Sequence, residues 1–180
     1  MIRYFMPLAL FAVVVLIFAL GIHQAPRKDL VPSPLIGKPA PSFSLPSLAD
    51  PNTPVTSASL LGHWYLFNVW GTWCVSCHVE EPELRAIART GVVPLIGLDW
   101  KDSREEALAY LHEKGNPYQA IAFDPGGLAA IQWGVYGAPE TFLVNPQGII
   151  VYKYIGPITP HAWAHEFLPR LPAGGAVAGS

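Results

Sequence analysis

Apolar residues gather in the middle of the chain in runs that are typical of buried strands. Residues 64–70 form a nearly continuous run rich in aromatic and β-branched side chains, and residues 92–100 form a second run. A third, shorter run lies near residues 119–123. Residues 140–145 and 149–155 also have strand patterns, and the turn sequence Asn-Pro-Gln-Gly that joins them predicts an antiparallel hairpin.

Helical patterns fill the gaps between the first strands. One covers residues 74–90, and Gly91 follows it where a C-cap glycine belongs. Pro82 lies inside this pattern and is expected to kink the helix. Ser103 and Glu106 have the spacing of a capping box, which predicts the start of the next helix.

Two later helices complete the pattern. Asp124 and Pro125 suit an N-cap and a first helical residue, so a short helix is expected to begin there. The last helix is expected from Thr159 to about Leu168. Alternation of strands and helices favours parallel pairing, and the late hairpin adds antiparallel strands. The expected fold is α/β, with a central mixed sheet flanked by helices on both faces.

The N-terminal segment differs from the rest of the chain. Residues 4–22 contain no charged side chain, and such a run is about long enough to cross the ~30 Å core of a bilayer. A cleaved signal peptide is the alternative, but the apolar run exceeds the usual length and no clean cleavage site follows it. Residues 42–61 mix short apolar runs with prolines, which predicts a hairpin or an irregular lead-in. The predicted division of the chain is a transmembrane anchor at 1–23, a Pro-rich linker at 24–41, a globular domain at 42–170 and a disordered tail at 171–180.

Charge narrows the function classes. The formal net charge is -2, only 13% of the residues are charged, and like charges do not cluster. Nucleic-acid binding depends on a strong basic surface, so we expect no nucleic-acid partner.

Both cysteines of the chain, Cys74 and Cys77, lie in one motif that fits two chemistries. Followed by His78, they match the C-x-x-C-H attachment site of c-type haem. Preceded by Trp73, they match the W-C-x-x-C site of thioredoxin-like proteins.

A redox dithiol explains the motif better than the other readings. Haem ligation by methionine would need a nearby Met, and both methionines lie in or before the apolar N-terminal run, although a distal histidine stays open. A cysteine pair at the end of a buried strand also has the sheet packed behind it, which leaves no obvious slot for a porphyrin. Zinc usually needs four protein ligands, more than this motif offers. A purely structural disulfide also explains the motif poorly, because a bridge across three residues adds little stability. We therefore expect no cofactor and no metal, with His78 on the helix surface.

The predicted elements place Cys74 at the end of a buried strand and the start of a helix. Unpaired backbone N–H groups and the helix dipole stabilise a thiolate there, so Cys74 is expected to be exposed and acidic. Cys77 follows one turn later on the same face. Trp73 and Trp70 are expected to shield the pair and to offer a flat apolar surface to a partner chain.

Two motifs together carry a family resemblance. Trp73-Cys74-Val75-Ser76-Cys77 resembles the thioredoxin active site. Residues 134–142, Gly-Val-Tyr-Gly-Ala-Pro-Glu-Thr-Phe, closely resemble the G-V-x-G-x-P-E-T-F fingerprint of the CcmG/DsbE family, the membrane-tethered thiol–disulfide oxidoreductases of cytochrome c maturation. The resemblance covers residues 36–170 and the anchor, and it implies a thioredoxin-like fold.

The resemblance also implies site residues. Pro139 matches the cis-proline that faces the dithiol, where Ala138 and its neighbours could pair with an extended substrate. Glu80 matches an acidic residue near the active site that could take a proton from Cys77, with a solvated surface carboxylate as the alternative. Glu140 could modulate the thiols or select clients, or lie on the surface.

Two polar residues qualify this expectation. Asn68 stands where thioredoxin has a buried Asp, and an amide cannot act as a base, so proton transfer at Cys77 must rely on Glu80, Glu140 or water. Asp99 could contribute or could cap a loop.

The implied clients are apocytochrome c or thiol proteins of cytochrome c maturation. The implied electron donor is a membrane thiol reductase, and the implied location is the inner membrane, attached to the bilayer by the N-terminal helix, with the domain in the periplasm. Two alternatives stay open: a general thioredoxin-like reductase or oxidase, and a non-catalytic module that binds haem or a client.

Overall fold

The computed structural model describes residues 2–23 and 33–172; residues 1, 24–32 and 173–180 lie outside the described part. Much of the predicted linker and nearly all of the predicted tail fall in the latter ranges. The chain divides into two compact units, Met1–Val31 and Pro32–Ser180. The first unit contains helix α1 (Ile2–His23). In the described ranges, no helix combines the length and the apolar character that crossing a membrane requires.

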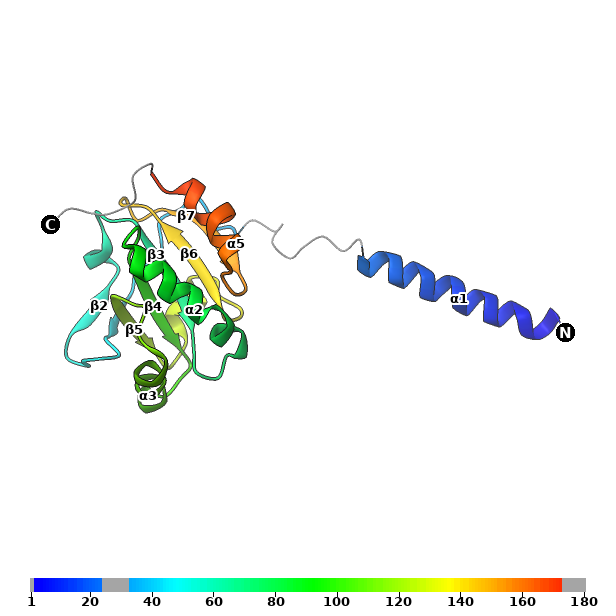
Figure 1. The fold of residues 1–180 in the computed structure, drawn as a ribbon, viewed down its shortest axis with the longest axis horizontal. Coiled ribbons are helices and arrows are strands. Elements are labelled where there is room, and N and C mark those ends of the chain that lie inside the picture. Colours follow the sequence, from blue (N-terminus) through cyan, green and yellow to red (C-terminus); the bar gives the residue numbers. More distant parts are fainter. Residues whose placement is uncertain (1, 24–32, 173–180) are drawn as a thin grey trace. The chain divides into compact units, whose positions relative to one another are not determined.

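A five-stranded mixed sheet forms the centre of the second unit (Figure 1). Its strand order is β5-β4-β3-β6-β7, with β3 parallel to β4, β4 parallel to β5, and β6 antiparallel to both β3 and β7. The bounds are β3 Tyr65–Trp70, β4 Leu95–Trp100, β5 Ala120–Asp124, β6 Glu140–Val144 and β7 Ile150–Ile155. The five strands and the mixed sheet predicted from the sequence are confirmed.

The residues before the sheet form a lead-in that packs on it. The predicted hairpin is present as the antiparallel strands β1 (Ser44–Pro46) and β2 (Pro54–Thr56), followed by the 3₁₀ turn η2 (Ala58–Leu60). Further upstream, the N–H of Gly37 and the N–H of Ala40 donate to the carbonyls of Ile150 and Gly148. Residues 37–40 are therefore joined to the edge of β7.

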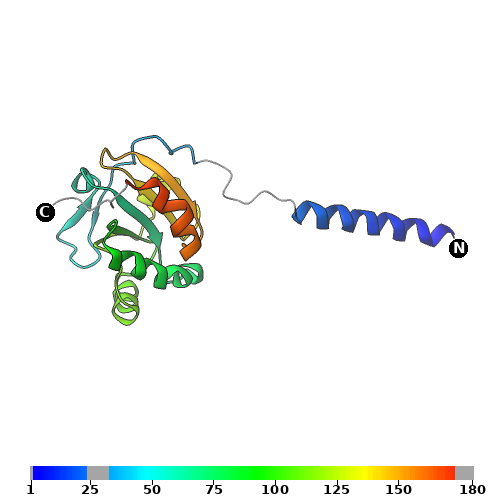
Figure 2. The same ribbon diagram turned by 45° about the horizontal axis from the view of Figure 1, so that its top comes forward.

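Helices cover both faces of the sheet. In Figures 1 and 2 helix α2 and the C-terminal helix lie on the same face, and their apolar residues share one core cluster with those of α3. The opposite face is covered by α4 and the lead-in. The bounds are α2 Val75–Thr90, α3 Arg104–Lys114, α4 Leu128–Gln132 and α5 Pro160–Ala162, which continues as the π-helical turn η3 Trp163–Phe167 and the 3₁₀ turn η4 Leu168–Arg170.

Side chains of β3 alternate between these two cores, as the period of a strand requires. Leu66 and Trp70 belong to the cluster under α2, whereas Phe67 and Val69 belong to the cluster under α4. On that second face Trp133 stacks on Phe67 with ring centroids 4.1 Å apart. Because all six residues of β3 are buried, the strand that leads to the cysteines is held from both sides.

Local signals set most helix ends, with one exception. Gly91 ends α2 in the left-handed region, Ser103 caps α3, and α2 continues through Pro82. The helix predicted to begin at Asp124 instead begins at Leu128. Asp124 is the last residue of β5, and its carboxylate reaches forward to accept from the N–H of Ala130. The prediction failed because a turn at Pro125–Gly127 separates strand from helix.

Candidate active site

The two cysteines lie where β3 gives way to α2. Cys74 is the N-cap of α2, and its Sγ accepts a hydrogen bond from the N–H of Cys77 at 3.1 Å. The two sulfurs form a disulfide, and the Cα atoms are 5.3 Å apart. A sulfur at this position faces the unpaired N–H groups of the first helical turn, which favour a negative charge. The pair can therefore store and release two electrons at a site that suits a thiolate.

Burial of the disulfide differs from the expectation of an exposed first thiol. Cys74 is 4% exposed and Cys77 is 5% exposed, and both belong to the core cluster under α2. Neighbours along the chain are more open, since Trp73 is 50% exposed. Trp73 and the exposed Val75 therefore flank the surface from which a partner can reach the disulfide.

The two tryptophans of the motif have different roles. Trp73 lies on the surface as predicted, and its Nε1 donates to the carbonyl of Trp100 at 3.0 Å. Trp70 is 3% exposed and stacks on Tyr118, so the prediction that it forms part of a partner surface is wrong. The reason is the alternation of β3, which turns Trp70 into the core under α2.

Glu80 is buried, and it has no cationic partner among residues 33–172. Its side chain is on the same buried face of α2 as Cys77, and its exposure is 0%, which excludes a solvated surface carboxylate. One oxygen accepts from Asn68 Nδ2 at 2.9 Å and the other accepts from the N–H of Ile158 at 2.9 Å. Burial raises the pKa of Glu80 to about 7, although these two hydrogen bonds oppose the rise. A carboxyl with this pKa can exchange a proton near neutral pH.

Asn68 connects Glu80 to two further side chains. Its Nδ2 also donates to Thr141 Oγ1 at 2.9 Å, and its Oδ1 accepts from the hydroxyl of Tyr118 at 2.6 Å. The amide is fully buried. Asn68 is therefore the centre of a network that joins α2, β3, β6 and the segment before β5.

The loop of Pro139 lies at the same end of the sheet as the dithiol, where β3 ends and β6 begins. The Ala138–Pro139 bond is cis, which confirms that expectation. Val69 pairs with Glu140 in antiparallel register, so the residues just before Glu140 lie beside those just after Val69. Within residues 33–172, neither backbone group of Ala138 makes a hydrogen bond. These two backbone groups are therefore free to pair with another chain.

Glu140 lies on the opposite face of the sheet from Glu80. Adjacent residues of a strand point to opposite faces, and Thr141 is the one that meets Asn68. The carboxylate of Glu140 forms a 2.7 Å ion pair with Lys153 and accepts from the N–H of Tyr136 at 3.3 Å. It is 0% exposed, so the surface alternative for Glu140 is wrong.

Asp99 is a second buried carboxyl, on β4. Burial raises the pKa of Asp99 to about 8, and the nearby negative charge of Asp102 adds to the rise. In the described chain its carboxyl oxygens receive no hydrogen bond from a loop, so it caps none. Asp102 caps the loop before Cys74 instead, since its carboxylate accepts from the N–H and the hydroxyl of Thr72.

His78 is exposed on α2, as expected. Its Nε2 is 3.0 Å from the carbonyl oxygen of Thr72, and its ring stacks on Tyr110. His78 therefore contacts the loop before Cys74 from the solvent side.

Sequence reasoning missed Lys153 and Tyr118. Lys153 had a signal, because it is the one charged residue in the predicted strand 149–155. Tyr118 had none, since its partner Asn68 is 50 residues away in the chain.

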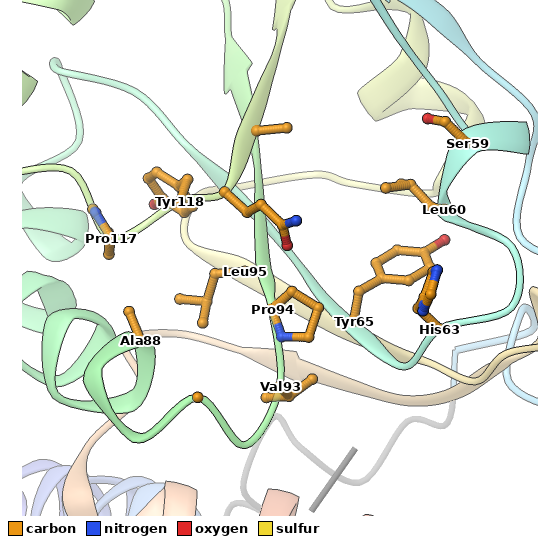
Figure 3. A pocket seen from close by; sticks show the side chains of 13 residues that line it. Ser59, Leu60, His63, Tyr65, Ala88, Val93, Pro94, Leu95, Pro117 and Tyr118 are labelled. Atoms are coloured by element: carbon orange, nitrogen blue, oxygen red, sulfur yellow. The ribbon is translucent and has the colours of Figure 1, made fainter. Parts of the chain in front are cut away.

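A separate cleft of about 760 Å³ opens at the other end of the sheet (Figure 3). Its lining includes Tyr65, Leu95 and Ala120, which are the first residues of the three parallel strands. The dithiol follows the far end of β3, and none of the predicted site residues lines this cleft.

Comparisons with known proteins agree with this geometry. The sequence model of the AhpC/TSA family matches residues 36–153. The thiol:disulfide interchange protein DsbE of Allochromatium vinosum is 49% identical over 167 residues, which cover 93% of this chain and 91% of that protein. The protein of the same name from Pseudomonas aeruginosa is 43% identical over 164 residues, with 91% and 89% covered.

A solved structure supports the fold. The crystal structure of a thio-disulfide isomerase from Thermus thermophilus matches with a TM-score of 0.63 and 26% identity, and covers 79% of this chain and 99% of that chain. The mixed sheet, the disulfide at the first turn of α2 and the cis-proline loop are therefore parts of a thioredoxin-like fold. With relatives this similar over nearly its whole length, the chain belongs to the DsbE family of thiol:disulfide interchange proteins and is a thiol–disulfide oxidoreductase.

Proposed function

We propose that this protein reduces the disulfide of apocytochrome c, at its C-x-x-C-H motif, either directly or through a thiol protein of cytochrome c maturation. The observation that carries the proposal is the Cys74–Cys77 disulfide at the first turn of α2, at the end of the sheet where the Pro139 loop also lies. The chain has no other cysteine, so every electron must pass through this pair. The fingerprint at residues 134–142 favours this client over a general one.

Cys74 is the nucleophile of the first step. In the reduced protein, the helix N-terminus lowers the pKa of the Cys74 thiol and supplies a thiolate. The thiolate attacks one sulfur of the client disulfide. A bond forms between Cys74 and that sulfur, the client disulfide breaks, and the other client sulfur leaves as a thiolate.

Cys77 completes the reaction. Its thiol gives a proton to Glu80, and the resulting thiolate attacks the sulfur of Cys74. The mixed disulfide breaks, the Cys74–Cys77 disulfide forms, and the second client sulfur leaves as a thiolate. The client has gained two electrons, and its thiolates take up protons from Glu80 and water. Glu80 suits this role because the pKa of its carboxyl is about 7.

Two groups are proposed to bind the client, and a third to hold the loop that carries one of them. The half-exposed ring of Trp73 offers an apolar surface beside the disulfide. The free peptide groups of Ala138 would pair with the client backbone as an added strand does. Glu140 does not contact the client; its carboxylate holds the loop in place by accepting a hydrogen bond from the N–H of Tyr136.

The proposed location is the periplasmic face of the inner membrane. It rests on the sequence of residues 4–22, which carries no charged side chain and would tether the domain. A membrane thiol reductase would return electrons to the oxidised pair, because the compartment itself is oxidising. Recovery of the full-length protein in the soluble fraction of disrupted cells would contradict the tether.

Trapping the client tests the proposal. Cys77→Ser leaves the Cys74 mixed disulfide unresolved, so it should accumulate in membranes of cells that make cytochrome c. Cys74→Ser is the matched control and should trap nothing. Mass spectrometry of the trapped species should identify a c-type apocytochrome or a maturation thiol protein. A trapped set of unrelated proteins would favour a general reductase, and the absence of any trapped species would contradict the mechanism.

A redox titration tests the direction of electron flow. A reductant should have a potential near that of thioredoxin, about −270 mV, rather than near that of the oxidant DsbA, about −120 mV. A value near the second would reverse the assigned direction.

A further inference from the structure

The hydroxyl of Tyr118 reaches into the network around Glu80. Tyr118 precedes β5 and is 9% exposed, and its ring stacks on Trp70 with centroids 5.6 Å apart. Its hydroxyl donates to Asn68 Oδ1 at 2.6 Å. Burial raises the pKa of the Tyr118 phenol well above its ordinary value, so the group keeps the proton that it donates. Figure 3 shows that Tyr118 also lines the cleft at the far end of the sheet.

This contact decides which way the amide of Asn68 points. The amide nitrogen has two N–H donors, and both are used, one on Glu80 and one on Thr141. A rotated amide would instead turn its oxygen towards the acceptor oxygens of Glu80. It would also take away the Oδ1 acceptor to which the Tyr118 hydroxyl donates, so that this hydroxyl could only accept from the amide N–H groups. The phenol therefore holds the donor side of the amide towards Glu80.

We propose that Tyr118 is a positioning residue, which acts through Asn68 to set the pH range in which Glu80 accepts the proton of Cys77. This inference rests on the proposed role of Glu80 in the second step of exchange. Tyr118 touches neither the client nor the sulfurs in this account. Its effect is confined to the orientation of one buried amide.

The direction of the effect follows from two opposing influences on Glu80. Burial favours the neutral acid, whereas the N–H groups of Asn68 and Ile158 favour the carboxylate. Without the Tyr118 hydroxyl, the amide is no longer held and donates less well to Glu80. The acid form then persists to higher pH, and proton transfer from Cys77 needs a higher pH.

Other titratable groups surround this site and must be kept constant. They are Cys77 and Glu81 on α2, Tyr110 on α3 and Asp99 on β4. The hydrogen bonds that reach the network from β6 and the C-terminal segment come from neutral groups, the hydroxyl of Thr141 and the N–H of Ile158. Tyr110 offers a matched control. Its ring also contacts Trp70, with centroids 5.9 Å apart, but in the described part of the chain the side chain of Asn68 accepts from Tyr118 and not from Tyr110.

The experiment compares Tyr118→Phe with Tyr110→Phe and with Glu80→Gln in the full-length protein. A synthetic oxidised peptide containing Cys-x-x-Cys-His is mixed with each reduced protein, and the rate of peptide release from the mixed disulfide is followed against pH. We expect Tyr118→Phe to move the midpoint of this profile upward by roughly one pH unit. Tyr110→Phe should leave the midpoint unchanged, and Glu80→Gln should remove the inflection.

A second measurement avoids enzyme activity. In the oxidised protein no thiol titrates, and the infrared band of the protonated carboxyl that is lost in Glu80→Gln reports on Glu80 directly. Its midpoint should also rise in Tyr118→Phe. If Glu80→Gln keeps the kinetic inflection, the proposed role of Glu80 fails. If Glu80→Gln removes it but Tyr118→Phe matches Tyr110→Phe in both measurements, the positioning role of Tyr118 is wrong.

Discussion

Lys153 and Glu140 form a buried ion pair at 2.7 Å, in which the side chains are only 4% and 0% exposed. The ammonium group of Lys153 also donates to the carbonyl of Gly134 at 2.8 Å and lies 5.0 Å from the ring centre of Tyr136. These contacts join both ends of the loop at residues 134–140. The pair therefore holds the loop that carries Pro139 against the sheet.

Removing one partner of this pair should be costly. Lys153→Met leaves the carboxylate of Glu140 buried and unpaired, and such a change typically destabilises a protein by about 3–5 kcal/mol. The double variant Lys153→Met/Glu140→Gln removes both charges and should recover part of that loss. Urea unfolding of the oxidised proteins measures both.

An exposed lysine provides the control for this prediction. Lys114 also pairs with a glutamate, Glu113, but both side chains are solvent-exposed. Lys114→Met should change stability little. Equal stability of Lys153→Met and the unchanged protein would show that the buried pair does not hold the loop.

Asp99 predicts how stability depends on pH. Its pKa in the folded protein is about 8, above the ordinary 3.8, so the folded state binds the proton more tightly than the unfolded chain. Stability from this group is therefore complete at low pH and is lost as pH rises from about 4 to about 8. Asp99→Asn should abolish the loss, and each pKa unit corresponds to about 1.4 kcal/mol.

The measurement is the urea midpoint of the oxidised protein at several pH values. The gain of Asp99→Asn over the unchanged protein should grow with pH and level off above about 8. The corresponding gain of Glu80→Gln should level off earlier, near 7. A gain of Asp99→Asn that is constant across this range would refute the assignment of a raised pKa to Asp99.

Gly71 should be intolerant of a side chain because of Trp73. A Cβ at Gly71 would lie 2.5 Å from Trp73 Nε1 and 3.1 Å from the carbonyl oxygen of Trp100. Gly71→Ala should displace the Trp73 ring from its hydrogen bond and slow reduction of the client peptide by roughly ten- to a hundredfold. Gly126→Ala is the control, since a Cβ there meets nothing within 4 Å. Unchanged kinetics in Gly71→Ala would mean that Trp73 does not need this position.

Local pattern was enough to predict the scaffold. The strands follow from apolar runs, and the start of α3 follows from Ser103, whose hydroxyl accepts from the N–H of Glu106 as a cap should. The position of Cys74 at the start of α2 follows from the strand and helix that flank it. The misplaced start of α4 shows the limit, because the carboxylate of Asp124 skips a turn to reach Ala130.

Burial of the acidic residues could not be predicted in the same way. Glu80 lies on a helix whose exposed and buried faces differ, and its partners Asn68 and Ile158 are 12 and 78 residues away. Glu140 depends on Lys153, across the hairpin. Such environments arise from tertiary contacts, which local periodicity does not report.

The central claim is that Cys74 is the nucleophile because it lies at the start of α2. The direct measurement is the rate of alkylation of each cysteine by iodoacetamide in the reduced full-length protein, as a function of pH. Cys74 should react first, with an apparent pKa well below the ~8.5 of free cysteine. A Cys74 that titrates near that value and reacts no faster than Cys77 would contradict the account.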